Sequence, residues 1–267
     1  MPSLEHPVIL DVRGLGMNFG GLRALDNVDI DVREKEIVAL IGPNGAGKTT
    51  FFNCITGLYE PTDGEVIISP PGRKSEKING LKPNIVTAKG LSRTFQNIRL
   101  FQNMTVLENV MIGRHCRTSS GIVGAILKGP ATRSEEKAIV RDSYAILEKI
   151  GLDESVNEFA KNLPYGEQRR LEIARALATE PFLLLLDEPA AGMNPQETLE
   201  LDDLIRRIRD EESISILLIE HDMKLVMSLS DRIFVVDYGR KIAQGAPGEI
   251  KNNPAVIKAY LGEDVDA

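Results

Sequence analysis

The sequence is poor in the residues that build metal sites and disulfide frameworks. Its 267 residues include no tryptophan, two cysteines and 5% aromatic side chains. Cys54 and Cys116 are far apart and form neither a CxxC pair nor a zinc-ligand spacing. We therefore expect a reducing compartment and two ordinary thiols, both buried or half-buried.

Long apolar runs are also missing. No stretch approaches the roughly 18 uncharged apolar residues of a membrane helix. The opening residues MPSLEHPVIL lack the basic segment and apolar run of a secretion signal. A net charge of −7 gives no general attraction to nucleic-acid phosphates. We expect a soluble chain that is not exported, does not bind nucleic acid, and relies on another polypeptide for any membrane-spanning part.

The apolar residues that are present fall into two strand patterns. Residues 8–12 and 28–32 alternate apolar and polar side chains, which predicts half-exposed antiparallel strands near the N-terminus. Continuous apolar runs, typical of strands covered on both faces, occur at residues 37–41, 182–186, 214–219 and 232–237. Helical patterns lie between several of these runs, so the fold class predicted is α/β with a mostly parallel sheet.

Two segments interrupt this pattern. Residues 69–90 are rich in proline, glycine and lysine and predict an exposed excursion. Residues 114–131 predict another; its apolar patch GIVGAIL is either a partner contact or, as we favour, a locally buried loop. Thr132 and Glu135 then have capping-box spacing ahead of an amphipathic helix that Gly151 ends.

The strongest chemical motif is GPNGAGKTT at residues 42–50, between an apolar strand and a helical segment. It matches the phosphate-loop pattern GxxxxGK[ST] in residue types, spacing and flanks. Its glycines let backbone amides face a β-phosphate, Lys48 can reach the β and γ oxygens, and Thr49 can hold Mg²⁺. The predicted nucleotide-binding residues here are Gly42, Pro43, Asn44, Gly45, Ala46, Gly47, Lys48, Thr49 and Thr50.

A second motif, FLLLLDEP, places two carboxylates directly after a buried strand. The carboxyl ends of parallel strands are the edge where α/β proteins bind their ligands. Asp187 is a candidate Mg²⁺ ligand there, and Glu188 a candidate base for an attacking water.

A third motif, NLPYGEQRR, runs directly into the helical segment LEIARALATE. Proline is tolerated at a helix start, where the first N–H groups lack intrahelical partners and can bind an anion. We therefore expect a helix to begin just after Pro164.

Taken in order, these motifs resemble those of ATP-binding-cassette (ABC) ATPases. The resemblance rests on GPNGAGKTT, RTFQN, LPYGEQRRLEIARAL, LLLLDEPAAGMNP and IEHDM. The amino-acid sequence of the second-half motifs and of the ending NNPAVIKAYLG is similar to that of the ATPase subunits of bacterial branched-chain amino-acid importers. The resemblance implies a P-loop fold with an N-terminal antiparallel β subdomain and an inserted α-helical subdomain.

It also implies a domain layout within one ABC ATPase domain. Residues 1–98 and 165–237 would form the core with its β subdomain, residues 99–164 the helical subdomain with its insertion, and residues 238–267 a C-terminal segment.

Three further residues take roles only through this resemblance. Gln96 would sense Mg²⁺ and the γ-phosphate, the alternative being an exposed loop glutamine. His221 would contact the γ-phosphate and orient the water together with Glu188. Phe19 would stack on adenine, unless it is a simple core phenylalanine.

The resemblance assigns LPYGE to a site shared between two protomers. Leu163, Tyr165, Gly166 and Glu167 would contact the nucleotide held by the phosphate loop of a second cassette. Pro164 stands where the family has serine and offers neither hydroxyl nor amide, which weakens this half-site. The implied cofactors are ATP and Mg²⁺. The implied partners are a second cassette, identical or related, integral membrane permease subunits and, indirectly, a solute-binding protein.

Several alternatives remain open at this point, and one of them is an ABC transporter ATPase for another cargo. A P-loop kinase would share GPNGAGKTT but has no use for LPYGEQRR or a distant His221. A soluble ABC ATPase usually has two cassettes or a long coiled-coil insertion, and this chain shows neither pattern. A nucleotide-dependent scaffold would not need Asp187, Glu188 and His221.

Overall fold

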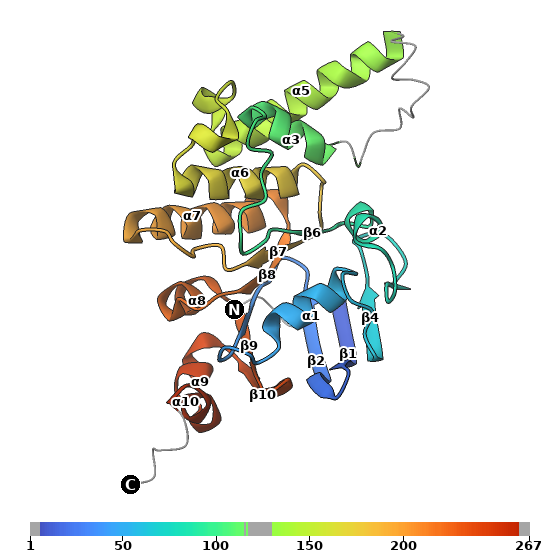
Figure 1. The fold of residues 1–267 in the computed structure, drawn as a ribbon, viewed down its shortest axis with the longest axis vertical. Helices are drawn as coiled ribbons and strands as arrows, with labels where there is room; N and C mark the ends of the chain where they lie inside the picture. The colour runs from blue at the N-terminus through green and yellow to red at the C-terminus, as the bar shows by residue number, and fades with distance from the viewer. Residues whose placement is uncertain (1–5, 115, 117–129, 262–267) are drawn as a thin grey trace. The chain divides into compact units, whose positions relative to one another are not determined.

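The computed structural model describes residues 6–114, 116 and 130–261. The chain divides into two compact units, one made of residues 1–93 with 182–267 and the other of residues 94–181. Each unit is described by itself below, with the elements labelled as in Figure 1.

The first unit contains an antiparallel sheet near the N-terminus. Its strands, in the order β2-β1-β4-β5, are β1 (Val8–Phe19), β2 (Leu22–Arg33), β4 (Asp63–Ile68) and β5 (Glu76–Lys77). Residues of β2 alternate between buried and less buried positions from Val28 to Arg33, because one face packs on the core, whereas β1 has adjacent buried residues such as Ile9 and Leu10, where its pairing with β2 shifts register. The antiparallel strands predicted from alternation are confirmed.

A second sheet of the same unit carries the four continuous apolar runs. Its order is β10-β9-β3-β8-β7-β6, and β10 alone runs antiparallel to its neighbour. The strands are β3 (Ile37–Ile41), β6 (Leu91–Arg93), β7 (Leu183–Asp187), β8 (Ser215–Ile219), β9 (Arg232–Asp237) and β10 (Arg240–Gly245). All residues of β3, β7 and β8 are buried, as expected for strands covered on both faces.

Helices complete the first unit. They are α1 (Lys48–Ile55), α2 (Pro83–Ala88), α7 (Pro195–Glu212), α8 (Met223–Leu229), α9 (Pro247–Lys251) and α10 (Pro254–Leu261). Phe51 and Phe52 of α1 are buried in a hydrophobic cluster with residues of both sheets. This cluster fixes α1, and with it the loop that precedes α1, against the ends of the parallel strands.

Helix α7 begins with a side-chain cap. Asn194 is its N-cap, and the side-chain oxygen of Asn194 accepts hydrogen bonds from the N–H groups of Gln196 and Glu197. The Glu197 carboxylate accepts from the Asn194 N–H in return, which completes a capping box. Its apolar face is buried and consists of Leu201, Leu204, Ile205 and Ile208.

The segment 69–90 differs from the exposed excursion predicted for it. It contains β5 and α2, and it buries the side chains of Ile78 and Val86 in the core cluster of the first unit. Its proline, glycine and lysine residues do form turns, but they also separate the few apolar residues of the segment, so the burial of Ile78 and Val86 was not expected.

The second unit is helical. It contains α3 (Val106–Arg114), α5 (Pro130–Ile150) and α6 (Tyr165–Leu177), with short 3₁₀ helices at Asp153–Ser155 and Ala160–Asn162. Helices α3, α5 and α6 pack on one another. At Gly113 the backbone of α3 lies so close to α6 that a Cβ added there would be 2.4 Å from the carbonyl oxygen of Arg175. This contact helps to group α6 with the helical unit.

One expectation about this unit changes. Helix α5 begins at Pro130, so Thr132 lies within the helix and is not its N-cap, while the end before Gly151 is as predicted. By contacts the helical unit runs from Thr94 to Pro181 and includes α6, and the subdomain layout implied by the resemblance stays a prediction. The apolar patch at residues 121–127 lies outside the described residues.

The two cysteines differ in exposure. Cys54 is buried on α1, but Cys116 is exposed, which corrects the expectation that both are buried or half-buried. Burial raises the pKa of the Cys54 thiol to about 11, so Cys54 carries little thiolate at neutral pH.

Alkylation of the native protein at pH 7.5 should therefore modify Cys116 and leave Cys54 unmodified. Both should react in denaturant, because unfolding returns Cys54 to water. Peptide mass spectrometry after timed iodoacetamide treatment checks this, with Cys116→Ser as the control that removes the fast site. Equal native rates at the two cysteines would contradict it.

No helix in the described part of the chain is long and apolar enough to cross a membrane.

Candidate active site

The phosphate loop joins β3 to α1 as the sequence predicts. Gly47 is the N-cap of α1 and has a φ of 100°, in the left-handed region. A Cβ at Gly47 would lie 2.8 Å from the Ala24 carbonyl oxygen, so both conformation and space require glycine. The first N–H groups of α1 have no intrahelical acceptors and are a suitable site for an anion.

Lys48 is the first residue of α1, and its ammonium group turns back onto the loop. Its Nζ donates to the carbonyl oxygens of Gly42, at 2.7 Å, and Pro43, at 2.9 Å. The residue is 6% exposed, and burial lowers the pKa of Lys48, while the charges of Glu188 and Asp187 act in the opposite direction. The structure thus places a buried cation within electrostatic reach of both predicted carboxylates.

Asp187 ends β7 and is buried. Its Oδ2 accepts a hydrogen bond from Arg93 Nη2 at 2.6 Å, and both side chains are almost fully buried. Arg93 ends β6, the neighbouring strand, and its other terminal nitrogen donates to the side-chain oxygen of Asn53 on α1 at 2.7 Å. Arg93 therefore links the carboxylate to the helix that follows the phosphate loop.

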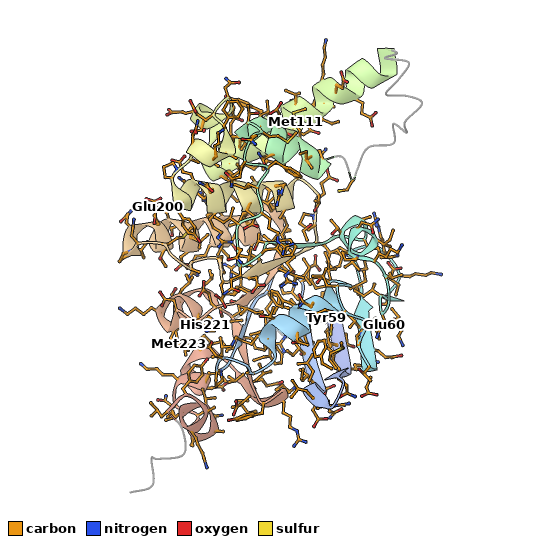
Figure 2. All side chains as sticks on the ribbon, in the orientation of Figure 1. Tyr59, Glu60, Met111, Glu200, His221 and Met223 are labelled. Atoms are coloured by element: carbon orange, nitrogen blue, oxygen red, sulfur yellow. The ribbon has the colours of Figure 1, made fainter. Side chains whose placement is uncertain are left out.

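Glu188 follows directly, and it pairs with His221. Glu188 has a φ of 48°, unusual for a residue other than glycine, and its N–H donates to the Ile219 carbonyl oxygen at 2.9 Å. His221 Nε2 lies 2.7 Å from Glu188 Oε1. His221 comes from the loop after β8, just before Met223 begins α8 (Figure 2). The fold thus brings together two candidate catalytic residues that are 33 positions apart.

Phe19 lies at the end of β1 and is 41% exposed, so it is not a core phenylalanine. Its ring meets that of Tyr59 edge to face, with the centroids 5.3 Å apart. Tyr59 follows α1 and is labelled in Figure 2. The edge contact leaves a ring face of Phe19 available for stacking on a planar group.

The remaining predicted site residues belong to the second unit. Helix α6 begins at Tyr165 with Pro164 as its N-cap, as predicted, and Gln168 N–H donates to the Pro164 carbonyl oxygen at 3.0 Å. Tyr165 is exposed, Gly166 and Leu163 are buried, and Glu167 is partly exposed.

Gln96 is attached to the same helix through its backbone. The guanidinium of Arg169 donates to the carbonyl oxygens of Phe95, at 2.7 Å, and Gln96, at 2.8 Å. Glu172 pairs with Arg169 at 2.8 Å and accepts from the N–H groups of Phe95 and Arg99 at 3.3 Å. The segment that carries Gln96 is therefore fixed to the helix that follows LPYGE.

Sequence reasoning missed three residues that this geometry makes prominent, namely Arg93, Glu220 and Arg169. Arg93 and Glu220 each lie at the carboxyl end of a buried strand or directly after it, so the rule that selected Asp187 could have selected them. Arg169 gave no comparable signal, because an arginine on a helix is usually solvated.

The arrangement in the first unit is that of a P-loop enzyme that hydrolyses a nucleoside triphosphate. The sequence model for "ABC transporter" matches residues 25–191, and one for "Branched-chain amino acid ATP-binding cassette transporter" matches residues 240–266. The chain belongs to the ABC transporter family. It is an ABC ATPase, and its ligand is a nucleotide.

Individual relatives agree with this assignment. The chain is 52% identical over 255 residues to the high-affinity branched-chain amino acid transport ATP-binding protein LivG of Salmonella typhimurium, across 96% of this chain and 98% of that protein. It is 49% identical to BraF of Pseudomonas aeruginosa, which carries the same description, with the same coverage. Among solved structures, the ADP conformation of an ATP-binding cassette of an ABC transporter matches with 31% identity and a TM-score of 0.82, covering 96% of this chain and 100% of that one.

Proposed function

We propose that this chain is the ATP-hydrolysing subunit of an importer of branched-chain amino acids. The observation that carries the proposal is its 52% identity, over 96% of its length, to a protein named for that transport. The match of residues 240–266 to a branched-chain amino acid cassette model supports the same cargo.

The cargo implies the rest of the assembly. We place the chain at the cytoplasmic face of the cell membrane, bound to integral membrane permease subunits that provide the path for the solute. A second cassette, either another copy or a related chain, completes the ATPase. A solute-binding protein on the outer side delivers the amino acid and contacts only the permease.

We assign the triphosphate to the loop at residues 42–50. The amides of Asn44, Gly45, Ala46, Gly47, Lys48, Thr49 and Thr50 surround the β-phosphate, with Gly42 and Pro43 beginning the turn. Lys48 exchanges the carbonyl oxygens of Gly42 and Pro43 for phosphate oxygens, which requires only that its flexible side chain extend. Phe19, in edge-to-face contact with Tyr59, stacks on adenine.

The oxygen donors predicted for Mg²⁺ fit the cation in kind. The Thr49 hydroxyl, the Asp187 carboxylate and the Gln96 side-chain oxygen are hard ligands of the type that Mg²⁺ prefers, and Mg²⁺ commonly keeps several waters. When bound, the cation neutralises charge on the β and γ oxygens. Asp187, which already pairs with Arg93, would be one of the residues that hold the cation.

Hydrolysis follows from the position of Glu188. Its carboxylate accepts the proton of the attacking water, while the bond to His221 Nε2 fixes the carboxylate and keeps His221 near the γ-phosphate. Lys48 and the loop amides stabilise the charge that develops on the transferred phosphoryl oxygens. Gln96 reports the state of the γ-phosphate to the helical unit, in which its backbone is bonded to Arg169.

The second unit supplies a contact to the nucleotide of the partner cassette. Leu163, Tyr165, Gly166 and Glu167 present the first turn of α6 to that γ-phosphate, where the helix dipole favours an anion. ATP bound between the two cassettes holds them together, and hydrolysis releases them.

Reconstitution tests the proposed cargo. The chain, co-expressed with its permease subunits and partner cassette, should import labelled leucine, isoleucine and valine into proteoliposomes when the solute-binding protein and ATP are present. A complex carrying Glu188→Gln serves as the control that assembles without turnover. Import of a different solute, or none with intact ATPase activity, would reject the branched-chain amino-acid assignment.

Pro164 provides a prediction about the shared half-site. Pro164→Ser should tighten ATP-dependent pairing by about 10- to 100-fold or raise turnover, because a hydroxyl bond to a charged oxygen is worth about 1.5–3 kcal/mol. Since Pro164 is the N-cap of α6, serine can also cap its own helix, so the unfolding temperature must be measured alongside. Pro164→Ala is the matched control without the hydroxyl. Unchanged pairing and turnover in Pro164→Ser would refute the idea.

A further inference from the structure

Glu220 is a buried carboxylate to which neither the motifs nor the roles above give a function. It follows β8 directly and is 3% exposed. Its Oε1 accepts a hydrogen bond from the Ala190 N–H at 2.8 Å. Its Oε2 accepts from the His221 N–H at 2.8 Å and from the Asp222 N–H at 3.2 Å. One side chain thus bonds to backbone groups of two different loops.

These two loops carry the proposed catalytic pair. Ala190 lies two residues after Glu188 in the loop that leaves β7, and His221 begins the loop that leaves β8. The last residue pair of the β7–β8 ladder is Asp187 with Ile219. Beyond that pair, one further backbone bond links the strand ends, from the Glu188 N–H to the Ile219 carbonyl oxygen, and Glu220 then bonds to both loops.

The conformation of Glu188 makes this connection important. Glu188 has a left-handed backbone conformation, which residues other than glycine disfavour. Its carbonyl oxygen accepts a hydrogen bond from the Ala191 N–H at 3.2 Å. Such a conformation persists only when surrounding bonds fix it, and the Ala190–Glu220 bond acts within that turn. The Glu188–His221 distance of 2.7 Å then depends on both loops remaining in place.

The geometry points to Glu220 as a positioning residue for ATP hydrolysis, which holds the Glu188 loop and the His221 loop in register. It does not touch the nucleotide, and it acts through the other two residues. The inference rests on the roles proposed above for Glu188 and His221. A carboxylate suits this task, because both of its oxygens accept hydrogen bonds and all three opposing groups are donors.

An amide cannot replace it. In Glu220→Gln one oxygen becomes an NH₂ group that faces an N–H donor, so one of the two loops loses its bond. We expect kcat of the full-length chain to fall about 10- to 100-fold, the range associated with misplacing a catalytic group by about 1 Å. The KM and Kd for ATP should change less than about two-fold, because the phosphate loop is untouched.

Glu249→Gln is the matched control. The Glu249 carboxylate is exposed and also accepts a hydrogen bond from a backbone N–H, that of Ala246. This variant should therefore leave kcat unchanged.

A double-mutant cycle separates positioning from general damage. In a Glu188→Gln background, Glu220→Gln should cause little further loss of single-turnover hydrolysis, because the residue it positions is already inactive. If Glu220 only stabilised the fold, the losses of activity caused by Glu220→Gln and Glu188→Gln would multiply in the double mutant. If Glu188→Gln itself turned over near the parental rate, the proposed function of Glu188 would fail, whatever Glu220 does.

A shorter acid provides a second test if Glu220→Gln does not fold. Glu220→Asp keeps the charge but lacks one methylene, so it reaches the His221 and Asp222 N–H groups and not that of Ala190. Its kcat should fall to an intermediate value at unchanged Kd for ATP. Parental kcat in a folded Glu220→Gln, or in Glu220→Asp where the amide variant is unfolded, would overturn the inference while leaving Glu188 as the base.

Discussion

Glu188→Gln is expected to slow ATP hydrolysis by about 10² to 10⁴-fold and to leave ATP binding intact. The substitution removes the proton acceptor but keeps the shape of the side chain. A glutamine amide can accept through its oxygen or donate through its nitrogen, so it can still pair with either tautomer of His221, which lies 2.7 Å from the Glu188 carboxylate. The geometry of the site should therefore survive while its chemistry does not.

Two measurements check this prediction. Phosphate release at saturating MgATP gives the loss in kcat, and titration with a fluorescent ATP analogue gives the Kd, which should stay within about two-fold because Lys48 and the loop amides are unchanged. The exposed Glu249→Gln should behave as the parent in both assays. A Glu188→Gln protein with near-parental turnover would remove Glu188 as the base and leave the catalytic role to another group.

The fold was predictable where periodicity was strong. The apolar runs at residues 37–41, 182–186, 214–219 and 232–237 correspond to β3, β7, β8 and β9 within one residue, because a strand buried on both faces must be continuously apolar. Prediction was poorer where two or three isolated residues decide the structure. Ile78 and Val86 reach the core from a polar segment, and Pro130 begins α5 ahead of the expected cap.

The candidate site shows the same division. Local motifs with fixed spacing identified Lys48, Asp187 and Glu188, because each motif is contiguous in the sequence. The partners of these residues come from other strands. Arg93 meets Asp187 across 94 positions, and Glu220 meets Ala190 across 30. Such pairs depend on the strand order β8-β7-β6, which a single sequence does not contain.

The second large expected effect is a loss of stability when the buried ion pair of Arg169 and Glu172 is broken. Arg169 is 0% exposed and Glu172 is 1% exposed, and together they bond to the backbone of the segment that carries Gln96. Removing one partner of a buried ion pair leaves an uncompensated charge and typically costs 3–5 kcal/mol. In Arg169→Met, the carbonyl oxygens of Phe95 and Gln96 also lose their donor. We therefore expect a loss of about 3–5 kcal/mol in the free energy of unfolding.

Urea unfolding of the full-length chain measures this loss, and the neighbouring arginine provides the control. Arg170 is partly exposed and lies 3.9 Å from Glu167, so Arg170→Met should cost less than about 1 kcal/mol. Glu172→Gln should cost a comparable amount, because its amide retains an oxygen for the Phe95 and Arg99 N–H groups but leaves the buried Arg169 without its counter-charge. If Arg169→Met proved no more damaging than Arg170→Met, the buried pair would not be what fixes the Gln96 segment to α6, and a signal from the γ-phosphate would need another route into the helical unit.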